Sequence, residues 1–464
     1  MNIVILAAGQ GKRMGPPPAK PVPKVLHHVA GRPMLAHVLD AVDAATTEHT
    51  VNIVIVVGYG AKQVQEAFHL RSTVDRRLRF VEQMEQLGTG HAVLQAEPLL
   101  NDAAPTLVLY GDVPLIRAAT LQKLFAASGD VALLTVQMAQ PTGYGRIVRD
   151  WHGNVLRIVE ERDASDDERE LTEVNTGILI APTARLKHWL KALSNDNAQR
   201  EYYLPDVIAQ AVREHCRVIA VDCADPDETR GVNSKEELAI VERAAQRRIA
   251  SELMERGTTL TDPARIDVRG KVGVGADVLI DVGCVFEGQV DLADGVRVGA
   301  YCVLRDCSVG AGTELLPFSH LHGATIGAGA RIGPYARLRP GALLGDEVHI
   351  GNFVEVKGST LGRASKANHL AYVGDATVGA NVNIGAGTIT ANYDGARKHR
   401  TVIGDDVSIG SNAVLVAPVT IGTGATIAGG SVISKNAPEG KLTLARAKQT
   451  TLDGWKRPTK DKKS

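Results

Sequence analysis

The second half of the chain repeats an aliphatic residue at every sixth position. One run is Ile326, Ile332, Leu338, Leu344, Ile350 and Val356. The same interval holds earlier at Val274, Ile280, Phe286, Leu292, Val298 and Leu304, and later at Ile403, Ile409, Leu415, Ile421, Ile427 and Ile433. A period of six fits neither an α-helix nor a two-sided strand, but it fits one side of a parallel β-helix with about 18 residues per coil. Glycine follows at 327, 333, 345 and 351, where a corner needs a backbone angle that other residues resist.

The repeat is interrupted at three places. Steps of five residues separate Val356 from Leu361 and Val373 from Val378, and a polar segment then occupies residues 390–400. Because a rigid coil can hold an inserted loop in place, this segment is a position where function can be carried.

The first half alternates short apolar runs with longer mixed segments. The runs occupy residues 2–7, 51–57, 106–110 and 131–136. Such runs are typical of strands that are covered on both faces. We therefore predict a parallel sheet flanked by helices, with ligands beyond the carboxyl ends of its strands.

Residues 234–256 are predicted to form one helix. Ser234 and Glu237 make a capping box, and Gly257 ends the helix. Its apolar stripe is Leu238, Val241, Ala245, Ile249 and Leu253. Glycine usage changes nearby, with 15 glycines in residues 1–256 and 30 in residues 257–434. We expect a first domain at 1–233, a helical linker at 234–256 that packs lightly on both domains, and a β-helix domain with a basic tail at 257–464.

Composition limits the kinds of binding partner and the cellular compartment that we expect for this protein. Lys plus Arg equals Asp plus Glu at 52 each, so neither nucleic acid nor an anionic membrane is favoured. The five cysteines form no C-x-x-C pair and are expected to be buried thiols in a reduced compartment, with a redox role as the alternative. The apolar run at 2–8 is too short for a membrane span and lacks a basic leader, so we expect a cytoplasmic protein.

Two predicted strands end in turns suited to phosphate and metal. After the first strand, Gly9 and Gly11 permit close approach to a phosphate, and Lys12 and Arg13 supply positive charge. Asp112 follows the strand at 106–110 and is well placed for Mg²⁺. A plain strand-to-helix turn and a capping Asp are the alternatives.

Amide side chains gather in other turns of the first half. Gln83 and the segment 86–90 follow an apolar pair at 80–81, where they could read the edge of a base, although a polar turn would look the same. Asn175 and Asn233 stand beside apolar runs, as contacts to hydroxyl groups or a metal would need.

Together these motifs resemble the sugar-nucleotide pyrophosphorylases. With the β-helix attached, the chain from Asn2 to about Arg457 is similar to the bacterial bifunctional N-acetylglucosamine-1-phosphate uridyltransferases and glucosamine-1-phosphate N-acetyltransferases. The resemblance implies an α/β Rossmann-like nucleotidyltransferase domain, a helical arm and a left-handed parallel β-helix of hexapeptide repeats that forms a homotrimer. It also implies UTP, N-acetylglucosamine-1-phosphate, acetyl-CoA and glucosamine-1-phosphate as substrates, Mg²⁺ as cofactor, and a product used for peptidoglycan and lipopolysaccharide.

The resemblance assigns a nucleotide site in the first domain. The residues that it places around UTP and its phosphates are Leu6, Ala7, Ala8, Gly9, Arg13, Lys24, Gln83, Gln86, Gly88, Thr89, Tyr110 and Gly111. Asp112 and Asn233 are implied metal ligands, and the N-acetylglucosamine ring is assigned to Gly145, Glu160 and Asn175. The link before Lys24 is longer than is usual in the family, which leaves Lys20 as an alternative phosphate contact.

Basic residues recur at the coil interval in the predicted β-helix. Arg339 and Lys357 are 18 residues apart and so lie on adjacent coils, where two cations favour an anion between them. A solvated basic face is the alternative. His369 lies nearby in sequence, but a lone histidine is usually structural or solvated.

The resemblance changes the interpretation of this histidine. It implies that His369 is the general base that accepts a proton from the glucosamine amine, oriented by Glu355. The residues that it assigns to glucosamine-1-phosphate are Arg339, Lys357, Tyr372, Asn383, Asn392 and Lys398. Those assigned to acetyl-CoA are Ala386, Tyr393, Ser411, Gly429 and Arg446.

Other interpretations stay open at this point. The β-helix could be an assembly or regulatory module on a nucleotidyltransferase, or the whole chain could be a structural trimer. A zinc site is a weaker alternative, because the available histidines lack the spacing of zinc-binding hexapeptide proteins: His320, His322, His349 and His369.

Overall fold

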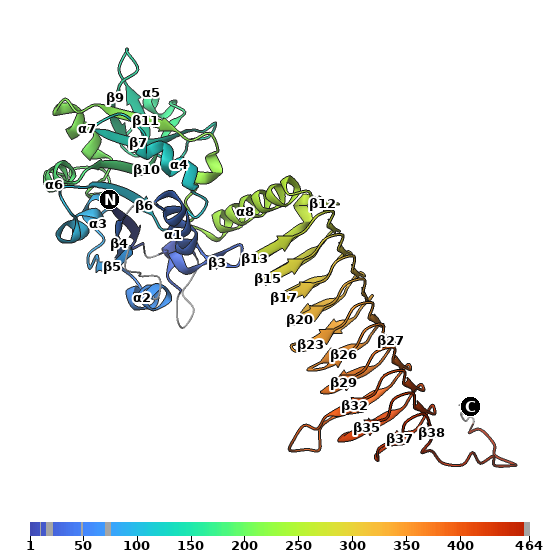
Figure 1. The fold of residues 1–464 in the computed structure, drawn as a ribbon. Coiled ribbons are helices and arrows are strands. Elements are labelled where there is room, and N and C mark those ends of the chain that lie inside the picture. Colours follow the sequence, from blue (N-terminus) through green and yellow to red (C-terminus); the bar gives the residue numbers. More distant parts are fainter. Residues whose placement is uncertain (10, 15–21, 48–49, 70–75, 459–464) are drawn as a thin grey trace, which may run out of the picture. The chain divides into compact units, whose positions relative to one another are not determined.

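The computed structural model describes residues 1–9, 11–14, 22–47, 50–69 and 76–458, and it divides into two compact units (Figure 1). Unit 1 is Met1–Arg247 and unit 2 is Arg248–Ser464. The division falls inside helix α8 (Lys235–Glu255). Among the described residues, no helix combines the length and the apolar character needed to cross a membrane.

Unit 1 is built on a sheet whose predicted strands are all present. β1 (Asn2–Ala7) lies between β4 (Val51–Val57) and β6 (Pro105–Tyr110) and is parallel to both. β5 (Arg76–Glu82) extends this part of the sheet beyond β4, and β7 (Val131–Gln137) belongs to its other half. All six residues of β1 are buried, because helices cover both faces.

Two apolar cores form on the two faces of this sheet (Figure 1). The helices that contribute to one core are α1 (Met34–Ala45), α2 (Ala61–Phe68) and α4 (Ala118–Phe125). Those of the other core are α3 (Thr89–Ala96), α6 (Thr183–Lys191) and α7 (Asp206–Arg213). The layered α/β arrangement is therefore the one that the apolar runs predict.

The predicted parallel sheet also contains antiparallel pairings. β10 (Glu173–Pro182) runs antiparallel to both β6 and β7, while β11 (Val218–Asp222) is parallel to β7. Between β7 and β10 the chain forms an antiparallel pair, β8 (Arg146–Arg149) with β9 (Val155–Val159), and the short helix α5 (Asp166–Arg169). An antiparallel strand needs no long crossover helix, so the mixed segment before β10 allows this reversal.

Helix α8 begins and ends as the sequence predicts. The Ser234 Oγ accepts a hydrogen bond from the Glu237 backbone N–H at 3.1 Å, and the Glu237 carboxylate accepts one from the Ser234 N–H at 3.0 Å. Gly257 follows the helix with a φ of +92°. The expectation of light packing is wrong, because Val241 and Leu253 are buried.

Unit 2 is a parallel β-helix, as the six-residue period predicts (Figure 1). Its strands form an 11-stranded sheet from β12 (Thr259–Leu260) to β38 (Leu442–Thr443) and a 16-stranded sheet. Side chains of successive coils stack in the interior: Ile332 pairs with Ile350, and Ile350 pairs with Ala367. All three are completely buried, so the repeated aliphatic positions form the core. The five cysteines are buried free thiols, as expected.

The predicted interruptions appear as coils of different length. Leu338 pairs with Val356 across 18 residues, whereas Val356 pairs with Val373 across 17. The pairing of Val378 with Ile403 spans 25 residues, and this longer coil contains the polar segment 390–400. A coil that gains or loses residues therefore keeps its interior aliphatic side chains in register. The change in length affects only the residues outside the core.

A neighbouring pair of leucines tests the core. Leu344 is buried, whereas Leu343 on the same strand, β23 (Ala342–Leu344), is 48% exposed. We expect Leu344→Ala to lower the free energy of unfolding by about 2–5 kcal/mol, because it leaves a cavity among stacked side chains. Leu343→Ala should change it by less than about 1 kcal/mol. Denaturant unfolding followed by circular dichroism measures both, and equal losses would contradict the assignment of the interior face.

Candidate functional site

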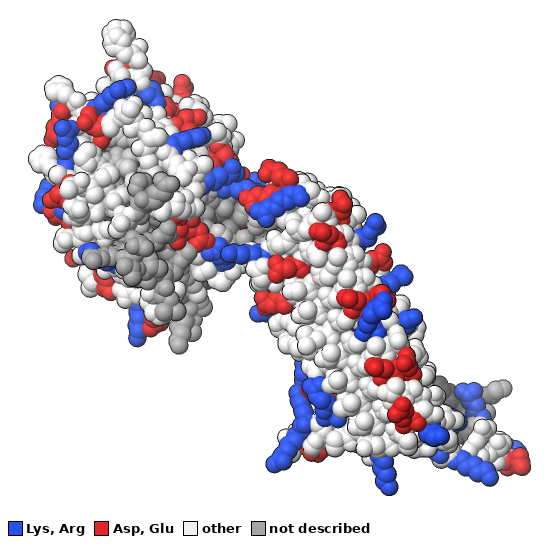
Figure 2. Space-filling model, viewed as in Figure 1, with Lys and Arg blue, Asp and Glu red and all other residues white. Residues whose placement is uncertain are grey.

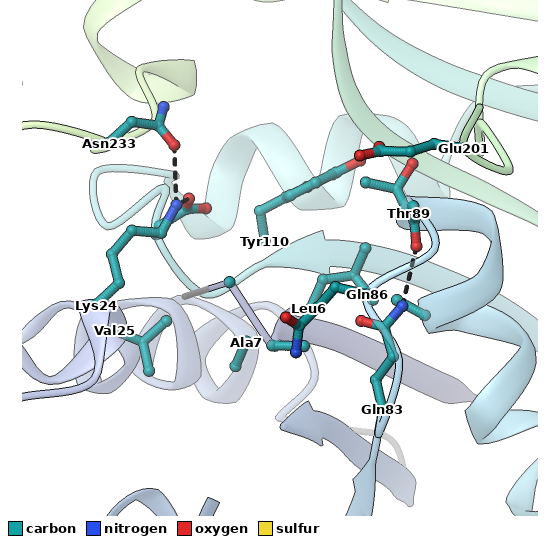
Figure 3. A pocket seen from close by; sticks show the side chains of 15 residues that line it. Leu6, Ala7, Lys24, Val25, Gln83, Gln86, Thr89, Tyr110, Glu201 and Asn233 are labelled. Atoms are coloured by element: carbon teal, nitrogen blue, oxygen red, sulfur yellow. Dashed lines mark hydrogen bonds and ion pairs between the residues drawn. The ribbon is translucent and has the colours of Figure 1, made fainter. Parts of the chain in front are cut away.

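Unit 1 contains a cavity of about 300 Å³ at the carboxyl ends of its parallel strands (Figure 3). The residues that line it are Leu6, Ala7, Ala8, Gly9, Lys24, Val25, Gln83, Gln86, Gly88, Thr89, Ala92, Tyr110, Asp112, Glu201 and Asn233. All but three of these residues were predicted to surround a nucleotide or its metal. The exceptions are Val25, Ala92 and Glu201.

Strand pairing explains why the turns after β1 and β6 meet. Leu6 and Tyr110 are register partners on these parallel strands, and the Gly111 N–H donates to the Leu6 carbonyl at 2.9 Å. The segments Ala8–Gly9 and Gly111–Asp112 therefore leave the sheet side by side. Gly111 joins the two turns but does not line the cavity.

A lysine ammonium lies between the two predicted metal ligands. Lys24 forms an ion pair with the Asp112 carboxylate and donates to the Asn233 Oδ1 at 2.9 Å (Figure 3). The Val232 N–H donates to the Asp112 carbonyl at 3.0 Å, which brings the loop that carries Asn233 to the end of β6. The side chains of Lys24 and Asp112 are 11% and 14% exposed, so the charges are partly shielded from water.

This arrangement fits a divalent cation that is shared with a substrate. The oxygens of Asp112 and Asn233 both reach one nitrogen atom, so they are close enough to share one cation. Among the described residues, no group of three or more His, Cys, Asp or Glu could hold a metal. A site with one carboxylate and one amide oxygen suits Mg²⁺, which takes its remaining ligands from water and phosphate.

The opposite end of the cavity is lined by amides and a narrow turn. Gln83 is buried and donates from Nε2 to the Gly88 carbonyl at 3.1 Å. Gly88 has a φ of +106°, and a Cβ there would lie 2.7 Å from the Tyr202 carbonyl oxygen, so only glycine fits. The Thr89 hydroxyl accepts from the Leu204 N–H at 3.1 Å. These contacts fix the positions of polar groups that can form hydrogen bonds with the edge of a nucleobase.

The three residues predicted to hold a sugar ring lie together beyond Tyr110. The Asn175 N–H donates to the Gly145 carbonyl at 2.8 Å, and a Cβ on Gly145 would lie 3.2 Å from the Glu160 Oε1. Burial raises the pKa of the Glu160 carboxyl, and the negative charges of two neighbouring Asp residues raise it further. Burial raises the pKa of Tyr110, and the negative charges of Glu160 and Asp112 raise it further.

Other predicted residues of unit 1 have different outcomes. Arg13 is exposed in a 3₁₀ turn, Lys12–Met14, and does not line the cavity. Lys20, the alternative to Lys24, lies outside the described residues. Glu201 was missed because it comes from an irregular loop between α6 and α7. Backbone hydrogen bonds of Tyr202 with Leu87 and Gly90 bring that loop to the cavity. No local sequence motif predicts these hydrogen bonds.

In unit 2, three cationic side chains converge on one face of the β-helix. Arg339 and Lys357 lie on adjacent coils, as the 18-residue interval predicts, and the Arg339 N–H donates to the Val356 carbonyl at 2.9 Å. The polar insertion brings Lys398 against Lys357. The pKa of Lys357 is lowered, mainly by the neighbouring Lys398 and further by the positive charge of Arg339, while the Asp375 carboxylate acts in the opposite direction. Figure 2 shows Lys and Arg side chains around the last coils. This cluster is suited to an anion.

His369 is held by an amide rather than by the expected carboxylate. Its Nδ1 lies 2.8 Å from the Asn352 Oδ1, and the two residues are register partners on adjacent coils. Because an amide oxygen only accepts, this contact favours the tautomer of the neutral imidazole that has its proton on Nδ1 and its lone pair on Nε2. Asn352 was missed, although the five-residue step between Val356 and Leu361 implies a coil of 17 residues that would pair it with His369.

The expected contact between Glu355 and His369 is not found in the described part of the chain. The Glu355 carboxylate pairs with Arg339 at 2.7 Å and with Arg337 at 3.7 Å. Glu355 lies past the corner at Phe353, on the 16-stranded sheet, while His369 is on the 11-stranded one. The corner therefore turns the carboxylate away from the imidazole.

The remaining predicted residues of unit 2 fall into two groups. Asn392 donates to the Tyr372 Oη at 3.3 Å, beside the cationic cluster. Asn383 is not part of that group, because it lies on the 11-stranded sheet beside Lys366 and Ser408.

The residues predicted to bind acetyl-CoA lie mostly on the last coils. The Asn412 N–H donates to the Ala386 carbonyl at 2.7 Å, and the Gly430 N–H donates to that of Ser411 at 2.8 Å. Arg446 donates to the Gly429 carbonyl at 3.0 Å, which continues this column. Tyr393 stands apart in the insertion and is exposed.

Comparisons with known proteins agree with a chain of two functional parts. The MobA-like NTP transferase domain family matches residues 3–194, the GMPPB C-terminal domain family matches residues 268–367, and the bacterial transferase hexapeptide family (six repeats) matches residues 400–435. The bifunctional protein GlmU of Cupriavidus pinatubonensis is 59% identical over 465 residues, covering 100% of both chains. The proteins of the same description from Ralstonia pickettii and Azoarcus sp. strain BH72 are 57% and 58% identical, again over 100% of both chains.

Proposed function

The chain belongs to the family of bifunctional GlmU proteins, and from this we propose how its residues divide between two reactions. It is a bifunctional enzyme of UDP-N-acetylglucosamine synthesis. It transfers an acetyl group from acetyl-CoA to glucosamine-1-phosphate, and then a uridylyl group from UTP to N-acetylglucosamine-1-phosphate with release of pyrophosphate. We assign uridylyl transfer to residues 1–233, acetyl transfer to residues 257–464, and the role of connector to residues 234–256.

The observation that supports the uridylyl assignment most strongly is the cavity of unit 1. It joins a base-sized end lined by Gln83, Gln86 and Thr89 to a charged end with Lys24 and Asp112. In the proposed complex, uracil lies against the amides and the sugar lies against Glu160 and its neighbours. The chain supplies no nucleophile, because a phosphate oxygen of N-acetylglucosamine-1-phosphate attacks the α-phosphorus of UTP and pyrophosphate leaves.

Lys24, Asp112 and Asn233 have linked roles in this proposal. The residues present fit Mg²⁺, which would neutralise phosphate charge when bound to Asp112 and Asn233. Lys24 is then free of both oxygens and donates to a phosphate. Arg13 is assigned to the same phosphates from the rim. Catalysis in this unit thus consists of positioning and charge neutralisation.

For acetyl transfer, we assign the phosphate of glucosamine-1-phosphate to the cations of unit 2. Lys357 and Lys398 are neighbours, with Arg339 and the Asp375 carboxylate close by, and a phosphate would reduce the repulsion among the three cations. Tyr372 and Asn392 border this position, and Asn383 is the assignment with the least structural support. Ala386, Tyr393, Ser411, Gly429 and Arg446 are proposed to hold acetyl-CoA.

The proposed base is His369. The amine nitrogen attacks the thioester carbonyl carbon, the new C–N bond forms, the C–S bond breaks, and coenzyme A leaves as the thiolate. The proton lost from nitrogen passes to His369 Nε2, while Asn352 holds the other ring nitrogen. Glu355 keeps Arg339 in place and contributes through that cation. We also propose that the enzyme is a homotrimer and works in the cytoplasm.

The assignment of Asp112 as a metal ligand predicts that its replacement removes one of the two activities and not the other. Asp112→Ala should abolish Mg²⁺-dependent formation of UDP-N-acetylglucosamine, because it removes the carboxylate that shares the Lys24 ammonium with Asn233. Acetyl transfer by the same preparation should stay near the normal rate. Pyrophosphate release and acetyl-CoA consumption measure the two activities, and a wild-type rate of UDP-sugar formation would disprove the assignment.

The base assignment predicts a loss in the other activity. His369→Ala should lower the kcat of acetyl transfer by about 10²–10⁴-fold, the usual contribution of general-base catalysis. It should also remove the acidic limb of the pH profile. Asn352→Ala serves as a comparison and should cause a smaller loss, since Nε2 remains. Uridylyl transfer is the internal control. A variant that keeps both the rate and the acidic limb would remove His369 from the mechanism.

The division of labour predicts separable fragments. Residues 1–256 should retain uridylyl transfer, whereas residues 1–233 should fold poorly, because they lack the buried Val241 of α8. Residues 234–464 should acetylate glucosamine-1-phosphate and sediment as a trimer. A folded but monomeric C-terminal fragment would contradict the proposed homotrimer.

A further inference from the structure

The three residues that we assign to the sugar lie in one row across neighbouring strands of unit 1. Arg146 on β8 is the register partner of the last residue of β9, which directly precedes Glu160, and of the residue of β10 that directly precedes Asn175. In antiparallel strands, the residue before one partner lies opposite the residue after the other. Gly145, the residue before Arg146, therefore lies opposite the other two. Arg146 is thus the immediate neighbour of the row that the sugar would contact.

The Arg146 side chain is a buried cation that contacts three separate segments. It is 2% exposed. Its guanidinium group donates to the carbonyl oxygens of Tyr144 and Arg169, and it forms an ion pair with the Glu161 carboxylate at 2.7 Å. Tyr144 precedes β8, Glu161 follows β9 and Arg169 ends α5, so one side chain joins the turn, the loop and the helix around the sugar row.

The burial of this guanidinium group depends on its carboxylate partner. A buried cation costs free energy unless it is both neutralised and hydrogen-bonded. The Arg146 Nε has no hydrogen-bond partner among the residues that the structure describes, so the Glu161 carboxylate matters all the more. Well-packed apolar residues can stabilise a protein interior as well as a buried ion pair does. The position of this pair beside the sugar row therefore indicates a role in the site.

We propose that Arg146 and Glu161 form a positioning pair that determines the affinity of the uridylyl site for N-acetylglucosamine-1-phosphate. Glu161 directly follows Glu160, so its ion pair fixes the backbone that carries the Glu160 carboxylate. Tyr144 directly precedes Gly145, so the hydrogen bond to its carbonyl oxygen fixes the opposite side of the row. The inference rests on the proposed sugar site and adds the two residues that keep its shape.

Arginine suits this role better than lysine. A guanidinium group is planar and presents several N–H donors in fixed directions, so it can bind two carbonyl oxygens and a carboxylate at once. An ammonium group in the same place would keep the charge but could not reach all three acceptors. Arg146→Lys therefore separates the effect of charge from the effect of geometry.

Steady-state kinetics of full-length variants test the proposal. Glu161→Ala removes the anchor beside Glu160, and we expect the KM for N-acetylglucosamine-1-phosphate to rise about 10-fold or more, because misplaced binding groups lose their contacts. The kcat and the KM for UTP should stay within about threefold of the wild-type values, since only binding of the sugar substrate is weakened. Glu161→Gln can still accept a hydrogen bond from the guanidinium group and should cause a smaller rise.

The two members of the pair should also depend on each other. Arg146→Lys should raise the same KM as Glu161→Ala does. The double variant should be no more impaired than the weaker of the two single variants, because both changes disrupt one interaction. Multiplication of the two effects would show that the residues act independently and would contradict the positioning pair.

A second ion pair across the same strands is the matched control. Arg149 on β8 donates to the Glu173 carboxylate on β10 at 2.7 and 2.6 Å. The Glu173 side chain is 16% exposed, against 29% for Glu161, so a general loss of stability would affect Glu173→Ala at least as strongly. We expect Glu173→Ala to keep the wild-type KM for the sugar phosphate. Thermal unfolding followed by circular dichroism measures the stability of each variant separately.

The Glu160→Gln variant distinguishes this inference from the proposed sugar site. It changes the assigned sugar contact itself and should raise the same KM. If it does so while Glu161→Ala keeps the KM within about twofold, or if Glu173→Ala raises it equally, the pair is only structural and the inference is wrong. If Glu160→Gln also leaves the KM unchanged, the assignment of the sugar site fails as well. Should Arg146→Lys not fold, the Glu161 variants decide alone.

Discussion

Hydrogen bonding between successive coils is the constraint on which unit 2 depends. Each strand lies beside its equivalent in the next coil, so the register decides which side chains meet. Ile332, Ile350 and Ala367 are buried in one column, and a slip by one residue would turn an interior column outward. The same register places Asn352 against His369 on the outside. Burial of the aliphatic side chains therefore also fixes the positions of the polar side chains outside. A coil that is one residue shorter keeps both the interior column and the outer contacts.

In unit 1, the pairing of parallel strands brings the residues of the site together. Parallel neighbours end at the same edge of a sheet, so the turns after β1 and β6 meet without any direct sequence relation between them. Lys24 and Asn233 come from segments that are more than 200 residues apart, yet they contact each other. Turns of this kind can differ in length, as the long link before Lys24 does, because the sheet rather than the turn sets the geometry.

The parts of this structure that the sequence predicts are those with a period or a sharp local signal. The four apolar runs became β1, β4, β6 and β7, and the five-residue steps became 17-residue coils. The antiparallel β10 was missed, because a buried strand looks apolar in either direction. Glu201 and Asn352 were missed because their relevance arises from contacts between distant segments. The family resemblance implied that Glu355 orients His369, and the sequence alone did not reveal that a corner of the coil lies between them.

The lysines that we assign to phosphate have different charged neighbours in the two units. In unit 1 the Lys24 ammonium is already neutralised by Asp112 and held by Asn233, so it must leave both before it can bind a phosphate. A cation bound to these oxygens would take the place of the ammonium, and Lys24 would then be available to a phosphate. In unit 2 the Lys357 and Lys398 side chains are neighbours, and the Asp375 carboxylate acts on both, so a bound phosphate would add to a negative charge that is already present. The proposed phosphate site of unit 1 thus has one lysine shared between two oxygens, whereas that of unit 2 has several cations with carboxylates beside them.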